Sequence, residues 1–137
     1  MKKRIVCLTG AVLLALWTGA CSHGKRTAEG VANDWLKVVD SGNYSQSWED
    51  GATIFKNAVA KEQWLGILEA NRTPLGAMTA RELMSAEYTT NLPGAPNGEY
   101  YVIQYASRFA NNRSVIETVT PVLDRDGQWR VAVYYVK

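Results

Sequence analysis

The spacing of the apolar residues changes halfway along this chain. In the first half, apolar residues recur every three or four positions, as they do on one face of an α-helix. The residues that carry this spacing are Ala28, Val31, Ala32, Trp35, Leu36 and Val39. In the second half, apolar residues alternate with more polar ones, which is typical of β-strands. Helices followed by antiparallel strands predict an α+β domain, with the helices packed on one face of a curved sheet.

The helical half is divided by recognisable end signals. The first helix ends at Ser41-Gly42, and Ser45 is a candidate N-cap for the next. A third helix, or a continuation of the second, is expected over residues 52–59, and another over 61–71. Thr73-Pro74 ends the last of them, because the residue before a proline avoids the helical conformation.

The second half predicts about four strands. The alternating segments cover residues 84–92, 99–109, 114–124 and 128–136. Asp126-Gly127 lies between the last two and is a strong hairpin signal. The expected sheet is therefore antiparallel.

The N-terminus has the layout of a secretory signal peptide. Three basic residues at positions 2–4 precede an apolar run over 5–17. A membrane-spanning helix needs roughly 20 apolar residues, and Thr18-Gly19 interrupts this run too early. The sequence therefore predicts a removable signal peptide over residues 1–20.

The four residues 18–21, Thr-Gly-Ala-Cys, resemble the lipobox of bacterial lipoproteins. The resemblance implies that Cys21 receives a lipid and becomes the first mature residue, although the usual box has leucine where Thr18 stands. The alternative is an ordinary secretory signal with Cys21 left as a free thiol. Residues 21–27 are then a lipidated polar tether, and residues 28–137 form a single domain. Aspartate after the cysteine favours the inner membrane in such lipoproteins, so Ser22 points to the periplasmic face of the outer membrane.

Removal of the signal peptide changes the inventory of charged and reactive side chains. The full chain has fifteen basic residues, and three of them leave with the signal peptide. The mature chain then has twelve basic and thirteen acidic residues, a formal charge of −1. Nucleic acid is an unsuitable partner for a domain without basic excess. Cys7 leaves with the signal, so the domain holds no disulfide, and the one histidine, His23, lies in the tether. We expect no metal site and no cofactor.

Glu117 is the candidate functional carboxylate. It lies between Val115 and Val119 on a face of its strand that is otherwise apolar, where an unpaired charge is costly. We favour an ion pair with one of four arginines over a raised pKa and a role as general base. The four candidate cations are Arg72, Arg81, Arg108 and Arg130, and the candidate site tyrosines are Tyr88, Tyr101 and Tyr105.

Several motifs are similar to those of an uncharacterised family of bacterial secreted and lipidated proteins, the domain of unknown function numbered 4019. They include Trp35-Leu36, Gly42-x-Tyr44, Arg72-x-Pro74-Leu75-Gly76, Leu92-Pro93-Gly94-Ala95-Pro96, Glu117 and Asp126-Gly127-Gln128-Trp129. The resemblance covers nearly the whole domain but implies no activity or ligand. A weaker, architectural likeness is to the cone-shaped fold of nuclear-transport-factor and ketosteroid-isomerase relatives, and a fold alone implies no function.

Two functional hypotheses follow. The first is a non-enzymatic module that binds an envelope protein or a second copy of itself, because the strands are apolar on both faces and helices cover only one. Strict alternation in the last strand sets Arg130, Ala132 and Tyr134 opposite Trp129, Val131 and Val133. The second hypothesis is a carrier of, or enzyme acting on, a small apolar ligand in a cavity between helices and sheet, with Glu117 as its polar group.

Overall fold

The structure of the chain, a computed structural model, describes residues 19–111 and 113–137, with side chains from residue 24 onward. The helices are α1 (Gly19–Asp40), α2 (Tyr44–Glu49), α3 (Thr53–Ala58), α4 (Lys61–Asn71) and the short 3₁₀ helix η1 (Thr73–Leu75). The strands are β1 (Met78–Thr89), β2 (Tyr100–Phe109), β3 (Arg113–Leu123) and β4 (Trp129–Val136). The predicted α+β class is confirmed.

Most of the predicted signal peptide, residues 1–18, lies outside the described residues. Residues 21–27, which the sequence predicts as a tether, form the first turns of α1. Lys25 and Glu29 are one turn apart there, with Lys25 Nζ 3.8 Å from Glu29 Oε1. Such a pair supports the helix that continues into the domain.

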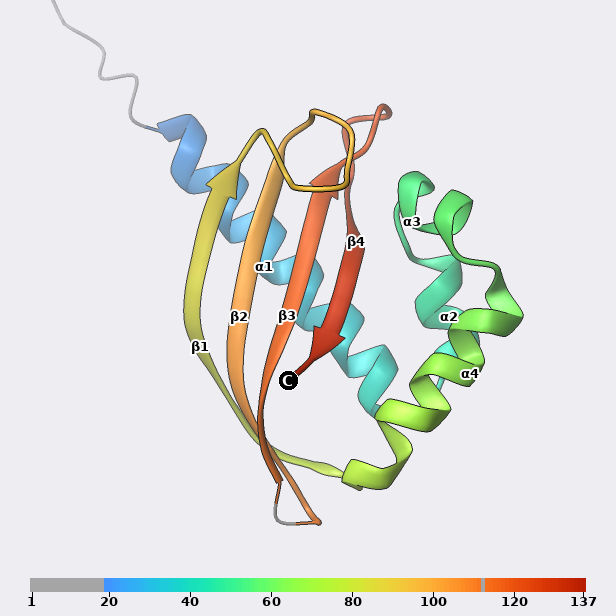
Figure 1. Cartoon of the computed structure of the whole chain (residues 1–137). Coiled ribbons are helices and arrows are strands. Elements are labelled where there is room, and N and C mark those ends of the chain that lie inside the picture. The colour runs from blue at the N-terminus through green and yellow to red at the C-terminus, as the bar shows by residue number, and fades with distance from the viewer. Residues whose placement is uncertain (1–18, 112) are drawn as a thin grey trace, which may run out of the picture.

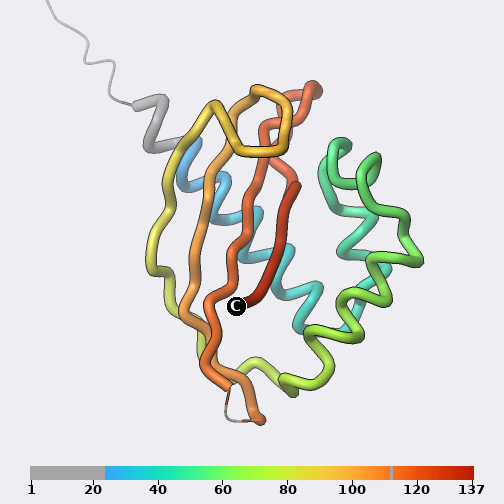
Figure 2. Tube along the Cα trace, in the orientation of Figure 1, coloured from blue at the N-terminus to red at the C-terminus, as the bar shows by residue number. Residues whose placement is uncertain are grey.

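The sheet has the strand order β1-β2-β3-β4, and every neighbouring pair is antiparallel. α1 crosses the inner face of this sheet, whereas α2, α3 and α4 lie beside the β4 edge (Figure 1). The trace in Figure 2 shows the same arrangement, with the other face of the strands turned away from α1. Helices on one side of a four-stranded antiparallel sheet are what the sequence predicted.

β1 begins six residues earlier than the alternation of the sequence predicts. Its register against β2 shifts between Met78 and Ala80 and again between Leu83 and Ser85. Each shift adds a residue to one strand of the pair, as in a β-bulge, and reverses the face on which the following side chains point. Residues 78–83 of β1 therefore do not continue the alternation that begins at Met84.

A similar shift corrects the predicted faces of β4. Thr120 pairs with Val133 but Pro121 pairs with Val131, so Ala132 is the extra residue. Trp129 and Val131 consequently share the inner face with Tyr134, although strict alternation placed Tyr134 opposite them. Tyr134 reaches the core only because of this irregularity.

The core between α1, α4 and the sheet is built on aromatic rings. The Trp35 ring centroid lies 5.2 Å from that of Tyr134, and the Phe55 centroid 4.8 Å from that of Trp64. Ser47 on α2 satisfies both buried indoles, accepting from Trp35 Nε1 at its carbonyl oxygen (2.8 Å) and from Trp64 Nε1 at Oγ (3.0 Å). Both tryptophans are buried, and the aromatic rings fill the space between helix and sheet.

The outer face of the sheet is not left wholly open. Near the start of β2, Tyr100 and Val122 are buried in a second apolar cluster, against which Ile54 and Leu92 pack. The chain before α3 also joins the sheet edge, because Ala52 N–H donates to the Val131 carbonyl at 2.8 Å. One end of the outer face is therefore covered by the protein's own chain, which the sequence did not predict.

Candidate functional site

Four charged side chains meet between α1 and the sheet, and we call them the buried charge network: Asp40, Arg72, Arg81 and Glu117. Asp40 is the last residue of α1, Arg72 follows α4, Arg81 lies on β1, and Glu117 lies on β3. Glu117 is completely buried, and the side chain of Arg72 is 4% exposed. The network holds two carboxylates and two guanidinium groups, so its formal charge is zero.

Glu117 is bonded through both of its oxygens. Arg81 donates to Glu117 Oε1 from Nε at 2.8 Å and from Nη2 at 2.7 Å. Ser107 Oγ donates to the same oxygen at 2.5 Å, and Tyr134 O–H donates to Oε2 at 2.7 Å. Charge-assisted hydrogen bonds of this kind offset the cost of removing a carboxylate from water.

Asp40 extends the network to the end of α1. Arg81 Nη1 donates to Asp40 Oδ2 at 2.7 Å, and Arg72 Nη2 donates to Asp40 Oδ1 at 2.5 Å. The Arg72 guanidinium carbon also lies 4.3 Å from the centroid of the Phe109 ring, which adds a cation–π contact. Asp40 thus joins both arginines and ties α1 to the segment after α4 and to β1.

These contacts perturb the protonation of the groups around the network. Burial lowers the pKa of Arg81, but its hydrogen bonds to Asp40 and Glu117 and their charges outweigh burial, so the pKa is raised overall. Burial, with a contribution from the Glu117 charge, raises the pKa of Tyr134 well above its ordinary value. Burial and the Glu29 charge raise the pKa of Tyr105 to about 12. All three groups keep their protons at neutral pH.

The sequence-predicted site residues meet only in part. Glu117 is paired, as favoured, and its cation is Arg81, one of the four arginines considered. Arg72 belongs to the network but bonds to Asp40. Tyr105 O–H instead donates to Asn33 Oδ1 at 3.0 Å, and Tyr88 O–H donates to Glu99 at 3.2 Å.

Sequence reasoning missed Asp40 and Tyr134. Asp40 ends a helix, where a carboxylate is ordinarily solvated and gives no sign of a buried role. Tyr134 bonds to Glu117 only because the irregularity at Ala132 turns it inward. The sequence carries no separate signal for that irregularity.

Glu117 is not an accessible proton acceptor. Glu117 is enclosed by Arg81, Ser107 and Tyr134, so water and substrate do not reach its oxygens in this arrangement. Among the described residues, no group of three or more His, Cys, Asp or Glu side chains is placed to hold a metal ion. The chemistry of the network is that of a structural ion-pair cluster.

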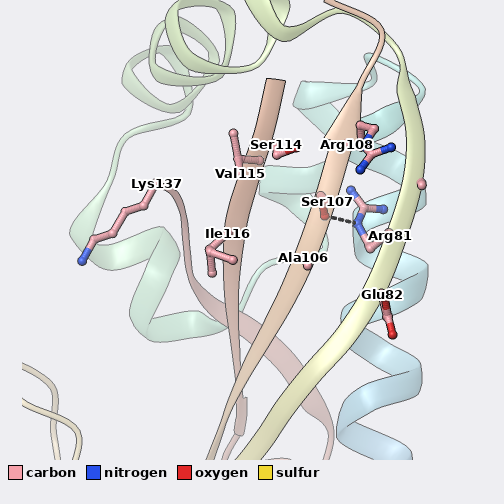
Figure 3. Close-up of a pocket in the computed structure, with 10 residues that line it drawn as sticks. Arg81, Glu82, Ala106, Ser107, Arg108, Ser114, Val115, Ile116 and Lys137 are labelled. Carbon is pink, nitrogen blue, oxygen red and sulfur yellow. Dashed lines mark hydrogen bonds between the residues drawn. The ribbon is translucent and has the colours of Figure 1, made fainter. Parts of the chain in front are cut away.

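Two open depressions lie on either side of β1. One, of about 550 Å³, lies on the outer face where the small residues Ala80, Ala106 and Ser114 leave room, with Glu82 and Lys137 at its rim (Figure 3). The other, of about 420 Å³, lies between α1 and β1, and we call it the α1–β1 groove. Its lining residues are Glu29, Asn33, Lys37, Asp40, Met78, Arg81, Leu83 and Tyr105.

The buried pair of Glu117 and Arg81 predicts strong coupling between substitutions. Glu117→Leu is expected to lower the free energy of unfolding by about 3–5 kcal/mol, because Arg81 keeps its charge and loses a partner. Combining it with Arg81→Met is expected to cost less than the sum of the two single changes. Urea unfolding followed by tryptophan fluorescence measures this, and additive losses would contradict the coupling. The exposed pair Asp34 and Lys37 is the control, where Asp34→Asn should cost about 0–1 kcal/mol.

The raised pKa of Tyr134 predicts loss of stability in alkali. Above the ordinary tyrosine pKa of about 10, the unfolded chain loses a proton that the folded protein keeps, so the free energy of unfolding falls as pH rises. Tyr134→Phe removes this contribution, and its stability should decline less steeply than that of the unsubstituted protein. Urea unfolding between pH 8 and 11 tests the slope. Equal slopes would show that Tyr134 titrates alike in both states.

One comparison with known proteins identifies the family. Residues 31–134 match the model of a family described as protein of unknown function (DUF4019). No curated protein and no solved structure matches the chain. Within the described residues, no helix is long and apolar enough to cross a membrane. Because the match spans most of the chain, including β1 to β3, all but the last two residues of β4 and all four residues of the buried charge network, the protein belongs to the DUF4019 family.

Proposed function

We propose that this chain is a lipid-anchored protein of the cell envelope whose α+β domain is a non-catalytic module that binds a partner protein. The lipid on Cys21 holds the domain at the periplasmic face of the outer membrane. The observation that carries the binding function is the exposure of large apolar side chains on one edge strand of the sheet.

β1 presents three such side chains to solvent. Leu83 is 46% exposed, Met84 56% and Tyr88 51%. A single exposed apolar residue needs no explanation, but a group on one strand is typical of an interaction surface. Since β1 is an edge strand of the described sheet, it also offers backbone groups to another strand.

The buried charge network supports a binding role over a catalytic one. A carrier or enzyme using Glu117 needs that carboxylate to face an apolar cavity, but Glu117 is enclosed by its hydrogen bonds. The space between α1 and the sheet holds the packed rings of Trp35 and Tyr134. The exposed apolar groups lie instead on the surface, where a macromolecule reaches them.

The start of α1 supports an anchor close to the domain. Cys21 lies in α1, and Ala28 on the same helix is completely buried. Seven helical residues rise about 10 Å, so a lipid on Cys21 would keep the domain near the bilayer surface. More than one acyl chain makes such an anchor stable.

The lipid anchor is tested by replacing its thiol. Cys21→Ser should abolish incorporation of labelled fatty acid and leave an uncleaved precursor, because serine cannot form the thioether. Metabolic labelling followed by membrane fractionation measures both effects, with Ser22→Ala as a control that should be lipidated normally. A normally lipidated Cys21→Ser protein would disprove the anchor at this position.

The binding surface is tested by crosslinking in intact cells. A photoreactive residue in place of Met84 should give a discrete adduct with an envelope protein, because this side chain is the most exposed of the three. The same residue in place of Glu69, exposed on α4, is the matched control and should give none. Equal adducts from both positions, or none from Met84, would contradict a binding surface on β1.

A further inference from the structure

We propose that the α1–β1 groove receives an extended, basic segment of the partner protein, which adds to the sheet as a strand beside β1. This inference rests on the proposed protein-binding function and names the site and the chemistry of the segment. The groove combines three things that such a segment needs: a free strand edge, an apolar wall and a buried carboxylate oxygen that accepts no hydrogen bond from the described residues.

The free edge comes from the sheet topology. Within the described residues β1 pairs with β2 alone, so its opposite edge has no strand partner. Between its two register shifts, residues 80–83 of β1 keep a regular register against β2. An added strand forms main-chain hydrogen bonds along such a stretch, and its alternate side chains point toward α1.

The apolar wall of the groove is formed by β1. Met78 and Leu83 line it, and Leu83 is 46% exposed. Both residues pair with inner-face residues of β2, Met78 with Phe109 and Leu83 with Tyr105. Inward-pointing aliphatic side chains of an added strand would cover Leu83 and remove it from water.

The charge requirement comes from Glu29. Its Oε1 is buried and accepts no hydrogen bond from the described residues, and Lys25 Nζ stands 3.8 Å away. Asp40, the other carboxylate of the groove, already accepts from Arg72 and Arg81. A lysine or arginine of the incoming segment would donate to Glu29 Oε1 and make a charge-assisted hydrogen bond in a partly buried place.

The outer side of β1 also carries carboxylates. Glu82 and Glu87 are both exposed on β1 and face away from α1. A basic segment therefore meets carboxylates on both sides of the edge. A second copy of this chain is a poorer occupant, because antiparallel pairing of two β1 strands through Leu83 and Met84 brings the Glu82 and Glu87 side chains of the copies near one another. The two bulges of β1 also interrupt the long flat edge that self-pairing needs.

The test uses a short peptide in which pairs of valines alternate with pairs of lysines, so that each face of the strand carries both residue types. Its counterpart has glutamate in place of every lysine. Titration of the domain carrying its full α1, followed by amide NMR, should shift the signals of residues 80–83 and of Glu29 with the lysine peptide only. Glu29→Gln should weaken this binding about tenfold, which is the effect of losing one charge-assisted hydrogen bond. Glu69→Gln, on the far helix α4, should leave it unchanged, and thermal melting confirms that both variants fold.

Three outcomes would overturn the proposal: no shift at residues 80–83, equal binding of the glutamate peptide, or binding that Glu29→Gln leaves unchanged. A fourth outcome comes from light scattering of the free protein. If the protein dimerises and dimerisation shifts the amide signals of residues 80–83, a second copy of the chain occupies the groove. The crosslink from position 84 distinguishes failure of the groove proposal from failure of the proposed protein-binding function. If that crosslink forms and survives Glu29→Arg while the peptide fails to bind, the protein-binding function stands and the groove does not supply its site.

Discussion

The ion pair between Glu117 and Arg81 is the interaction on which the arrangement of the domain depends. A carboxylate with no exposed surface is stable only where hydrogen bonds replace its water, and Arg81, Ser107 and Tyr134 supply them. Arg81 has further guanidinium N–H donors, and Asp40 at the end of α1 accepts from them. The pair therefore joins the end of α1, the inner face of β1 and Tyr134 of β4 in one set of hydrogen bonds.

This arrangement explains how an edge strand exposes apolar side chains and still keeps its place. β1 lies at the margin of the sheet, with β2 as its one strand neighbour among the described residues. On the inner face of β1, Arg81 forms ion pairs with Asp40 and Glu117. The position of β1 therefore does not depend on burial of Leu83 or Met84. Those side chains remain available for another protein, and the register shifts on either side of residues 80–83 limit pairing with unrelated strands.

The sequence predicted those features that follow from local spacing. The helical stripe ending near Asp40 and the burial of Glu117 follow from apolar spacing of 3.6 and 2 residues. The hairpin follows from its Asp126-Gly127 turn signal. The irregularities of β1 and β4 did not, because an inserted residue reverses every following side chain and leaves no mark in composition. Tyr134 was missed because of the irregularity in β4. Asp40 was missed because a carboxylate at a helix end is ordinarily solvated. The choice of Arg81 among four arginines required knowledge of strand register, which is a long-range property.

The helix α1 connects the proposed anchor to the proposed groove. Cys21 lies in this helix, and Glu29, Asn33, Lys37 and Asp40 line the groove from the same helix. Cys21 lies eight residues before Glu29, a rise of about 12 Å along the helix. With the proposed lipid on Cys21, a segment bound at Glu29 would lie close to the membrane surface. A partner attached to the same membrane would meet the groove at high effective concentration, and a weak contact of one strand and one ion pair would then be sufficient. The small size of the groove is consistent with such a partner. Confinement to a shared membrane raises the effective concentration of the partner and compensates for the small contact area.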